Sequence, residues 1–332
     1  MRAPSRSARL FVVAATLTVA TLASAEPPTQ DWTRTETRAD CTSYNALRSP
    51  FFGETHIHTS FSGDAAFVRV RTTPRDAYMF AKGGQIGLPP YDAMDQPTRF
   101  AQLRRPLDFT AVTDHAELFG ELEICRDPKS VGYDSAVCRL YRWWPRLAFF
   151  VMNSRSTRAE SPQRFSFCGE DGQDCLAAAR TPWQATREAA EAAYDRTPAC
   201  SFTSFVGYEW TGGPGTNNIH RNVIFRNDRV PELPISYLDE PRPEGLWRRL
   251  REVCHDGRDG CDALSIPHNS NISGGIMFVA ADAKGAWSSA EQAAARAAAE
   301  PLVEIMQHKG ESECRLGPES ADELCGFEKL PY

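Results

Sequence analysis

Glu54-Thr55-His56-Ile57-His58-Thr59-Ser60-Phe61-Ser62-Gly63-Asp64 is the stretch to which the other features of this sequence relate. We expect its first half to be a β-strand, in which residues two apart point to the same face, so that the imidazoles of His56 and His58 can reach one cation. Asp64 follows a Ser-Gly turn and offers a carboxylate to the same point. This combination is typical of a metal site. On spacing alone, a polar strand face explains the two histidines equally well.

Short apolar runs alternate with helical segments along the rest of the chain. We predict strands over 51–57, 108–113, 202–208, 223–225 and 263–266, a further apolar run over 302–306, and helices over 75–81, 182–195, 244–253 and 289–299. Thr181 and Pro182 are read as the N-cap and first residue of the second helix. Residues 83–98, rich in Gly, Pro and Asp, are expected to form a loop. This alternation predicts an α/β fold with a mainly parallel sheet.

Polar, metal-competent residues follow most of these strands. They are Asp114-His115, Glu209, His268 within Pro267-His268-Asn269, and Glu304, while His220 comes just before the strand over 223–225. Barrel-type α/β enzymes carry their chemistry at the carboxyl ends of strands. Each residue alone also has an ordinary explanation: a histidine at a strand end usually makes a structural hydrogen bond, and Glu304 with His308 can be a solvated helical pair. Six of the seven histidines nevertheless fall at or just beyond strand ends, and His255 is the exception.

Imidazole and carboxylate ligands without thiolate suit Zn, Mn or Fe better than Mg or Ca. The number of candidate ligands is enough for two or three divalent ions. A bridging carboxylate such as Glu209 can hold two ions about 3.5 to 4 Å apart, which activates water and neutralises charge on a substrate. The predicted chemistry is therefore metal-assisted hydrolysis of a small molecule.

The N-terminus has the features of a secretory signal peptide. Arg2, Arg6 and Arg9 precede an apolar run over 10–22, and Ala23-Ser24-Ala25 fits the small-residue cleavage signal. The apolar run is shorter than the roughly 20 residues that span a bilayer, so we expect no stable membrane anchor. Cleavage near Ala25 would place the mature protein in the periplasm or outside the cell, beginning with a polar arm over 26–48.

Charge and cysteine content agree with export. Removal of residues 1–25 takes three arginines away and changes the formal net charge from −6 to −9, which does not favour nucleic-acid binding. All ten cysteines follow the cleavage point, as in disulfide-bonded proteins of oxidising compartments. Proximity suggests the pairs Cys125–Cys138, Cys168–Cys175, Cys254–Cys261 and Cys314–Cys325, which leaves Cys41 and Cys200 as a long-range pair. Residues 125–200 are read as a Cys-rich helical insertion that borders the site, with Trp143 and Trp144 in its core.

Several motifs together resemble a known family. His56-x-His58-Thr59-x-x-Ser62-x-Asp64, Thr113-Asp114-His115, the strand-end Glu209 and Pro267-His268-Asn269 resemble the PHP superfamily, named for polymerase and histidinol phosphatase. More closely, segments 207–211, 220–226 and 266–271 resemble the mostly exported, PHP-like domain of unknown function 3604 family. The resemblance covers nearly all of residues 51–332, within a predicted hydrolase domain over 49–332.

The resemblance implies a distorted (β/α) barrel with a metal cluster at the carboxyl ends of its strands, and phosphoester hydrolysis as the commonest activity. The matching ligand positions are His56, His58, Asp64, His115, Glu209 and His268. The nearby polar residues are Asp114, His220, Arg221, Asn269, Glu304 and Lys309. Of these, Asp114, His220, Arg221 and Lys309 are the candidate catalytic residues, and Arg221 or Lys309 can hold a phosphate oxygen.

Two departures from the family qualify this interpretation. Gly53-Glu54 stands where the family usually has Gly-Asp. Relatives also continue to a late Asp-x-His, whereas this chain stops at Leu330-Pro331-Tyr332, so we expect a barrel that is incomplete at its C-terminus. Two alternatives therefore stand beside the phosphoesterase: a hydrolase of an amide, lactone or carboxylic ester, and an inactive fragment that only binds metal or ligand. Oligomeric state, substrate identity and the metal are not predicted.

Overall fold

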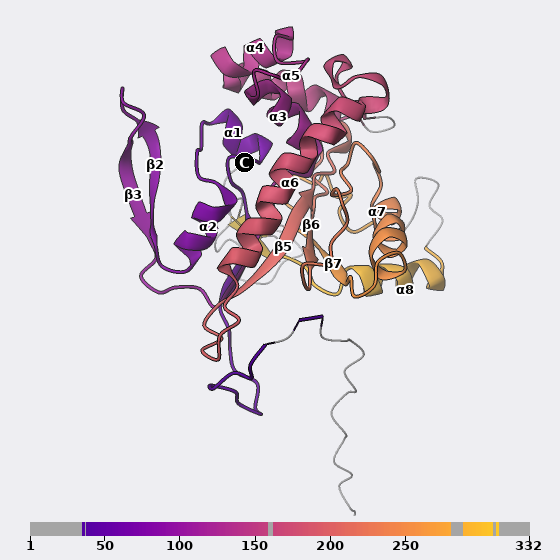
Figure 1. The fold of residues 1–332 in the computed structure, drawn as a ribbon. Coiled ribbons are helices and arrows are strands. Elements are labelled where there is room, and N and C mark those ends of the chain that lie inside the picture. Colours follow the sequence, from indigo (N-terminus) through magenta and orange to yellow (C-terminus); the bar gives the residue numbers. More distant parts are fainter. Residues whose placement is uncertain (1–34, 37, 159–161, 280–287, 308–309, 312–332) are drawn as a thin grey trace, which may run out of the picture. The chain divides into compact units, whose positions relative to one another are not determined.

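The computed structural model describes residues 35–36, 38–158, 162–279, 288–307 and 310–311. A five-stranded sheet lies at the centre of this part of the chain (Figure 1). Its strands run in the order β1 (Gly53–Ile57), β4 (Phe109–Val112), β5 (Thr203–Trp210), β6 (Arg221–Phe225) and β7 (Ala263–Pro267). The predicted strands thus exist within a few residues of their predicted bounds. The fold is a mixed α/β fold.

The sheet is mixed, so the prediction of a mainly parallel sheet is wrong for its second half. β1, β4 and β5 are parallel, whereas β6 is antiparallel to both β5 and β7. Residues 211–220 contain only the short turn η4 (Pro214–Thr216), and a parallel crossover needs a dozen or more residues. The chain therefore returns antiparallel at β6. β7 reverses again and ends at the same sheet edge as β5.

The sequence predicts a distorted barrel that is incomplete at its C-terminus, and the described residues form an open sheet. β1 and β7 form the two ends of the sheet order, and no described strand pairs one with the other. The apolar run at 302–306 does not extend the sheet: β8 (Met306–Gln307) pairs only with β9 (Gly310–Glu311). A backbone hydrogen bond from Glu304 N to the Pro267 carbonyl connects this run to the end of β7.

Helices cover one face of the sheet (Figure 1). The first is α2 (Pro74–Ala81), whose N-terminus is closed by a capping box between Thr73 and Asp76. The second is α6 (Gln173–Ala193), whose buried Trp183 packs against the rings of Tyr208 and Phe225. The remaining helices are α1 (Gly63–Phe67), α3 (Phe119–Arg126), α4 (Ala136–Trp143), α5 (Pro145–Ser156), α7 (Pro243–Leu250) and α8 (Ala290–Ala299), with short turns η1 (Ala116–Leu118), η2 (Ser166–Cys168), η3 (Glu170–Gly172) and η5 (Arg251–His255).

The start of α6 was predicted wrongly. The helix begins at Gln173, and Pro182 lies inside it instead of at its first turn. Buried positions recur at helical spacing on both sides of the proline, from Cys175 through Ala179 to Thr186 and Ala193. Burial of this continuous stripe offsets the roughly 3 kcal/mol that an interior proline costs.

Residues 83–98 form most of a hairpin where a loop was predicted. β2 (Gln85–Tyr91) pairs antiparallel with β3 (Pro97–Gln102), apart from the main sheet. The Asp92 carboxylate accepts hydrogen bonds from the backbone N–H groups of Met94 and Gln96, which closes the turn. Prolines are tolerated here because a two-stranded ribbon has unpaired edges on both sides.

Four of the five predicted cysteine pairs lie at disulfide distance: Cys41–Cys200, Cys125–Cys138, Cys168–Cys175 and Cys254–Cys261. The fifth, Cys314–Cys325, and the predicted signal peptide lie outside the described residues. The Cys41–Cys200 bridge joins the N-terminal arm to the loop before β5. None of the helices in the described part of the chain combines the length and the apolar composition needed to cross a membrane.

Candidate metal centre

The predicted ligand positions meet at one edge of the sheet. β1, β4, β5 and β7 all end at this edge, and antiparallel β6 begins there. His56 is in β1, Glu209 is in β5, and His220 immediately precedes β6. The structure brings together seven side chains there: His56, His58, Asp64, His115, Glu209, His220 and His268.

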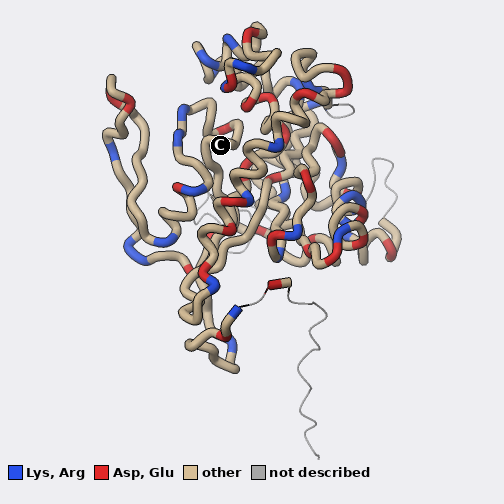
Figure 2. Tube along the Cα trace, in the orientation of Figure 1, with Lys and Arg blue, Asp and Glu red and all other residues tan. Residues whose placement is uncertain are grey.

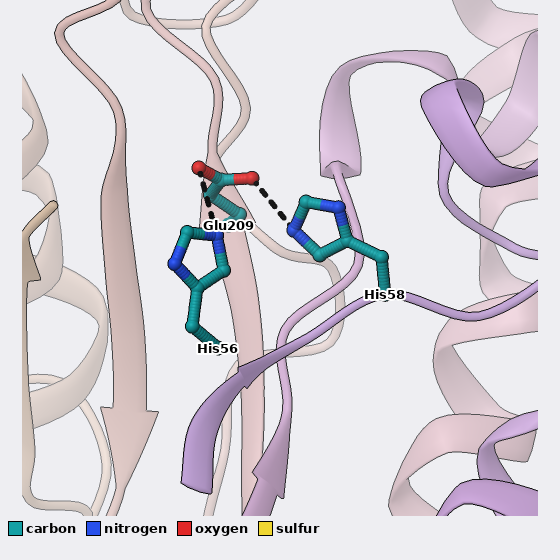
Figure 3. Close-up of side chains that lie close together, drawn as sticks. All are labelled: His56, His58 and Glu209. Atoms are coloured by element: carbon teal, nitrogen blue, oxygen red, sulfur yellow. Dashed lines mark ion pairs between the residues drawn. The ribbon is translucent and has the colours of Figure 1, made fainter. Parts of the chain in front are cut away.

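Glu209 lies at the centre of this group. Its carboxylate is fully buried, and each oxygen faces two imidazoles. Oε1 lies 2.9 Å from His220 Nδ1 and 3.7 Å from His56 Nε2. Oε2 lies 2.9 Å from His115 Nδ1 and 3.1 Å from His58 Nε2. Figure 3 shows the carboxylate with one oxygen toward His56 and the other toward His58. This is the arrangement of a bridging carboxylate.

Asp64 supplies a second carboxylate from the first turn of α1. Its Oδ2 lies 2.8 Å from His58 Nδ1 and 3.6 Å from His115 Nε2. Its Oδ1 accepts a hydrogen bond of 2.7 Å from Ser62 Oγ, which fixes the orientation of the carboxylate. His58 therefore stands between Asp64 and Glu209, with one ring nitrogen toward each.

His268 and Glu304 complete the group from the end of β7 and the segment beyond α8. The ring of His268 lies 4.8 Å from that of His220 and 6.0 Å from that of His56, centroid to centroid. Glu304 Oε1 lies 2.9 Å from His56 Nδ1, and Glu304 Oε2 accepts from the Asn269 N–H. A carboxylate bonded to the second nitrogen of a ligand histidine fixes its ring and raises its basicity.

Strong mutual electrostatics hold this group together. Burial disfavours the ionised form of Glu209, yet His115 and His220 hold its pKa well below the ordinary value. Burial likewise opposes a charged His58, but Asp64 and Glu209 raise its pKa to about 9. The same two carboxylates raise the pKa of His115 against its burial. The buried Glu209 carboxylate thus requires positive charge beside it, from protonated imidazoles or from cations.

Two buried atoms indicate that a cation fits. His58 Nε2 and Glu209 Oε2 lie 3.1 Å apart but form no hydrogen bond with any described residue. Three overlapping sets of side chains place their ligand atoms close enough to share an ion: His56, His58 and Glu209; His58, Asp64 and His115; and His115, Glu209 and His220. A cavity of about 590 Å³ gives access to this edge, lined in part by His56, His58, Asp64 and Glu304.

The polar neighbours predicted from the sequence are not all part of the group. The Asp114 carboxylate accepts from Thr59 Oγ1 at 2.6 Å and also from the Thr59 N–H, so it fixes the backbone after β1. Burial raises the pKa of Asp114 to about 6. Arg221 Nε lies 2.8 Å from Glu300 Oε1, on the helix-covered face of the sheet. Successive residues of a strand point to opposite faces, so Arg221 points away from the face that carries His220. Lys309 lies outside the described residues.

Two residues at the site were not predicted. Thr211 Oγ1 lies 2.5 Å from His115 Nδ1, and Glu117 is a buried carboxylate that interacts with His115 and Thr211. Burial raises the pKa of Glu117 despite the nearby His115. Both lie two residues after a predicted ligand: Thr211 after Glu209 and Glu117 after His115. Their closeness to the ligands in the sequence could have indicated them. The cluster of Glu121, Cys168 and Cys175 is excluded as a thiolate site, because its two cysteines are bonded to each other.

Comparison with known proteins yields one match. A family model described as "Protein of unknown function (DUF3604)" matches residues 45–332, which bears out the resemblance drawn from the motifs at 207–211, 220–226 and 266–271. No curated protein and no solved structure matches the chain.

Proposed function

We propose that this chain, which belongs to the DUF3604 family of proteins of unknown function, is an exported metal-dependent hydrolase that acts on phosphoesters. The observation that carries the proposal is the buried Glu209 carboxylate with four imidazoles around its two oxygens. A single hydrogen-bonding histidine at a strand end is common, but four imidazoles around one buried carboxylate are not explained by structural hydrogen bonding alone. We further place the fold in the PHP superfamily, whose sheet is a distorted barrel.

The proposed ligands are His56, His58, Asp64, His115, Glu209 and His268, with two or three Zn, Mn or Fe ions. We add His220, because its Nδ1 lies as close to Glu209 as that of His115. Bound ions of this kind act as Lewis acids and lower the pKa of water toward neutrality. Glu304 orients His56, and Thr211 contacts His115, so both support ligands without being ligands themselves.

Phosphoesters are the substrate class proposed on the likeness to the PHP superfamily. Arg221 takes no part in substrate binding in this proposal, because its guanidinium is buried in a pair with Glu300. The cations at the cluster therefore have to balance the charge of a phosphate. Asp114 holds Thr59 in place and is a positioning residue.

The test has two steps. Metal content per chain is first measured by plasma mass spectrometry on protein purified from an exporting host, and we expect two or more Zn, Mn or Fe ions. Release of phosphate from phosphomonoesters and diesters is then compared with hydrolysis of carboxylic esters, lactones and amides. Bound metal with activity only on carbonyl substrates would overturn the substrate class. A folded protein that binds no metal would overturn the hydrolase proposal and favour an inactive fragment.

A further inference from the structure

The helices α4 and α5 form a pair in which α5 is apolar on two opposite faces. One face is buried: Ala148 and Met152, four residues apart, are inaccessible to solvent. This face belongs to a small core that also contains the Cys125–Cys138 and Cys168–Cys175 bridges. A helix that is apolar on all sides is normally covered on all sides.

The opposite face of α5 is exposed. Leu147, Phe150 and Val151 follow the i, i+3, i+4 spacing of one helical face, and Phe150 is 70% exposed. Trp143 and Trp144, at the junction of α4 and α5, are 65% and 62% exposed, so the prediction that they form a core is wrong. We call these five side chains the aromatic patch. No described residue covers it, and patches of this kind mark interaction sites.

The charge around the aromatic patch is basic in an acidic protein. Residues 136–156 contain four arginines and no Asp or Glu, although the whole chain has a formal net charge of −6. Arg139 and Arg146 are exposed. Arg142 is half-buried and donates to the Tyr133 carbonyl, near the exposed Asp134 just before α4. Figure 2 shows the blue segments on this pair of helices, which are labelled in Figure 1.

We propose that the aromatic patch binds reversibly to a membrane surface with anionic lipid headgroups. Exposed tryptophans beside arginines match the interface of a bilayer, where indole rings lie at headgroup level and guanidinium groups meet phosphates. A second copy of this chain fits less well, because a two-fold interface would set the arginines of one patch against those of the other. The proposal concerns surface binding, which is compatible with the absence of a spanning helix among the described residues.

The patch is connected to the candidate metal centre through one short helix. The ring of Phe67, at the end of α1, packs edge-on against the rings of Tyr141 of α4 and Phe149 of α5, with ring centroids 5.7 Å and 5.5 Å apart. Asp64, in the first turn of the same helix, contacts His58 and His115. If α4 and α5 bind a membrane surface, only α1 would therefore separate the candidate metal centre from the helices that contact the headgroups.

Co-sedimentation with lipid vesicles tests the proposal. The protein, expressed from its full gene in an exporting host, is mixed with vesicles of phosphatidylglycerol and phosphatidylcholine, or of phosphatidylcholine alone. We expect binding to the anionic vesicles that weakens as salt is raised. Binding should fall about tenfold or more in the double variant Leu147→Gln/Phe150→Gln, and also in Arg139→Gln/Arg146→Gln.

Matched variants elsewhere control for exposed side chains in general. Met94→Gln/Phe100→Gln changes two exposed apolar residues of the β2–β3 hairpin, and Arg104→Gln/Arg105→Gln changes two exposed arginines. Both should bind as the unchanged protein does, and melting curves confirm that all variants fold. Any contribution of the apolar run at 10–22 to vesicle binding is the same in every variant. The difference in binding between variants therefore measures the contribution of the aromatic patch.

Three results would overturn the proposal. One is no binding to anionic vesicles at low salt, and another is equal loss of binding in the control variants. The third is a dimer in sedimentation velocity that Leu147→Gln/Phe150→Gln dissociates, which would identify a second copy as the occupant. Metal content is independent of all three, so failure here leaves the hydrolase proposal standing.

Discussion

Glu209 Oε2 lies 3.1 Å from His58 Nε2, and among the described residues neither atom completes a hydrogen bond. Both atoms are buried, and an unsatisfied buried polar group costs about 1 to 3 kcal/mol. A cation bound between these two atoms and the nearby Asp64 carboxylate would satisfy them, so we expect the stability of this site to depend on a cation. Substitutions at the candidate metal centre are therefore expected to change its affinity for metal.

Glu209→Gln should abolish binding of at least one ion. The amide keeps the shape of the side chain but removes the negative charge that the four neighbouring imidazoles and a cation require. We expect affinity to fall by more than the roughly 10- to 100-fold that loss of an outer partner costs. Chelator competition and metal content measure this. Glu188→Gln, on the exposed side of α6, is the matched control. Unchanged metal content in Glu209→Gln would exclude Glu209 as a ligand.

Glu304→Gln should weaken metal binding without abolishing it. Glu304 lies 2.9 Å from His56 Nδ1, so it acts on the ring and leaves Nε2 directed toward Glu209. The loss expected for such an outer partner is about 10- to 100-fold in affinity. The same competition assay gives the value. An effect as large as that of Glu209→Gln would instead make Glu304 a ligand.

The sequence predicted where the candidate metal centre lies, but it did not predict the strand directions of the sheet that carries it. Polar residues directly after apolar runs marked the ends of β1, β4, β5 and β7, and such ends meet when strands run the same way. The position of His220 depended on the reversal of β6, which a Gly- and Pro-rich turn did not specify. The motif places Arg221 next to His220, but alternation in a strand directs the two side chains to opposite faces of the sheet, and Arg221 pairs there with Glu300.

Two other predictions are wrong because a single residue type indicated one structure while packing along a longer segment determined another. Pro182 looked like a helix start because proline is favoured there, but the buried stripe of α6 runs through it. Trp143 and Trp144 were assigned to a core from hydrophobicity alone, and such residues are often exposed where they serve an interface. In both cases the outcome depended on packing partners that are distant in sequence.

Arg221→Met should destabilise the protein while leaving metal content unchanged. The Arg221 and Glu300 side chains are 1% and 3% exposed, so removal of the arginine leaves a buried carboxylate without its main counter-charge. Breaking such a pair costs about 3 to 5 kcal/mol in unfolding free energy. Urea denaturation measures this. The double variant Arg221→Met/Glu300→Met should recover much of the loss. A stable Arg221→Met protein with impaired phosphoester hydrolysis would instead place Arg221 at the substrate.

Removal of the Cys41–Cys200 bridge should cost more stability than removal of Cys254–Cys261. The first closes a separation of 159 residues and the second a separation of 7. Loop-closure entropy predicts about 5 kcal/mol for the long loop and about 2 kcal/mol for the short one. Paired Cys→Ser variants, compared by denaturant unfolding, give the two values. Equal losses would show that chain entropy is not the main contribution of these bridges.

Stability should fall at low pH partly through Asp195. The side chains and backbone N–H groups of Thr197 and Ser201 donate to this exposed carboxylate, and together they hold its pKa well below the ordinary value of 3.8. Because the folded pKa is depressed, the contribution of Asp195 is complete above pH 3.8 and is lost as the pH falls below it. Asp195→Asn should be less stable than the unchanged protein at neutral pH, and the difference should narrow on acidification. A difference in unfolding free energy that stays constant from pH 7 down to strongly acidic conditions would assign the effect to loop geometry instead of charge.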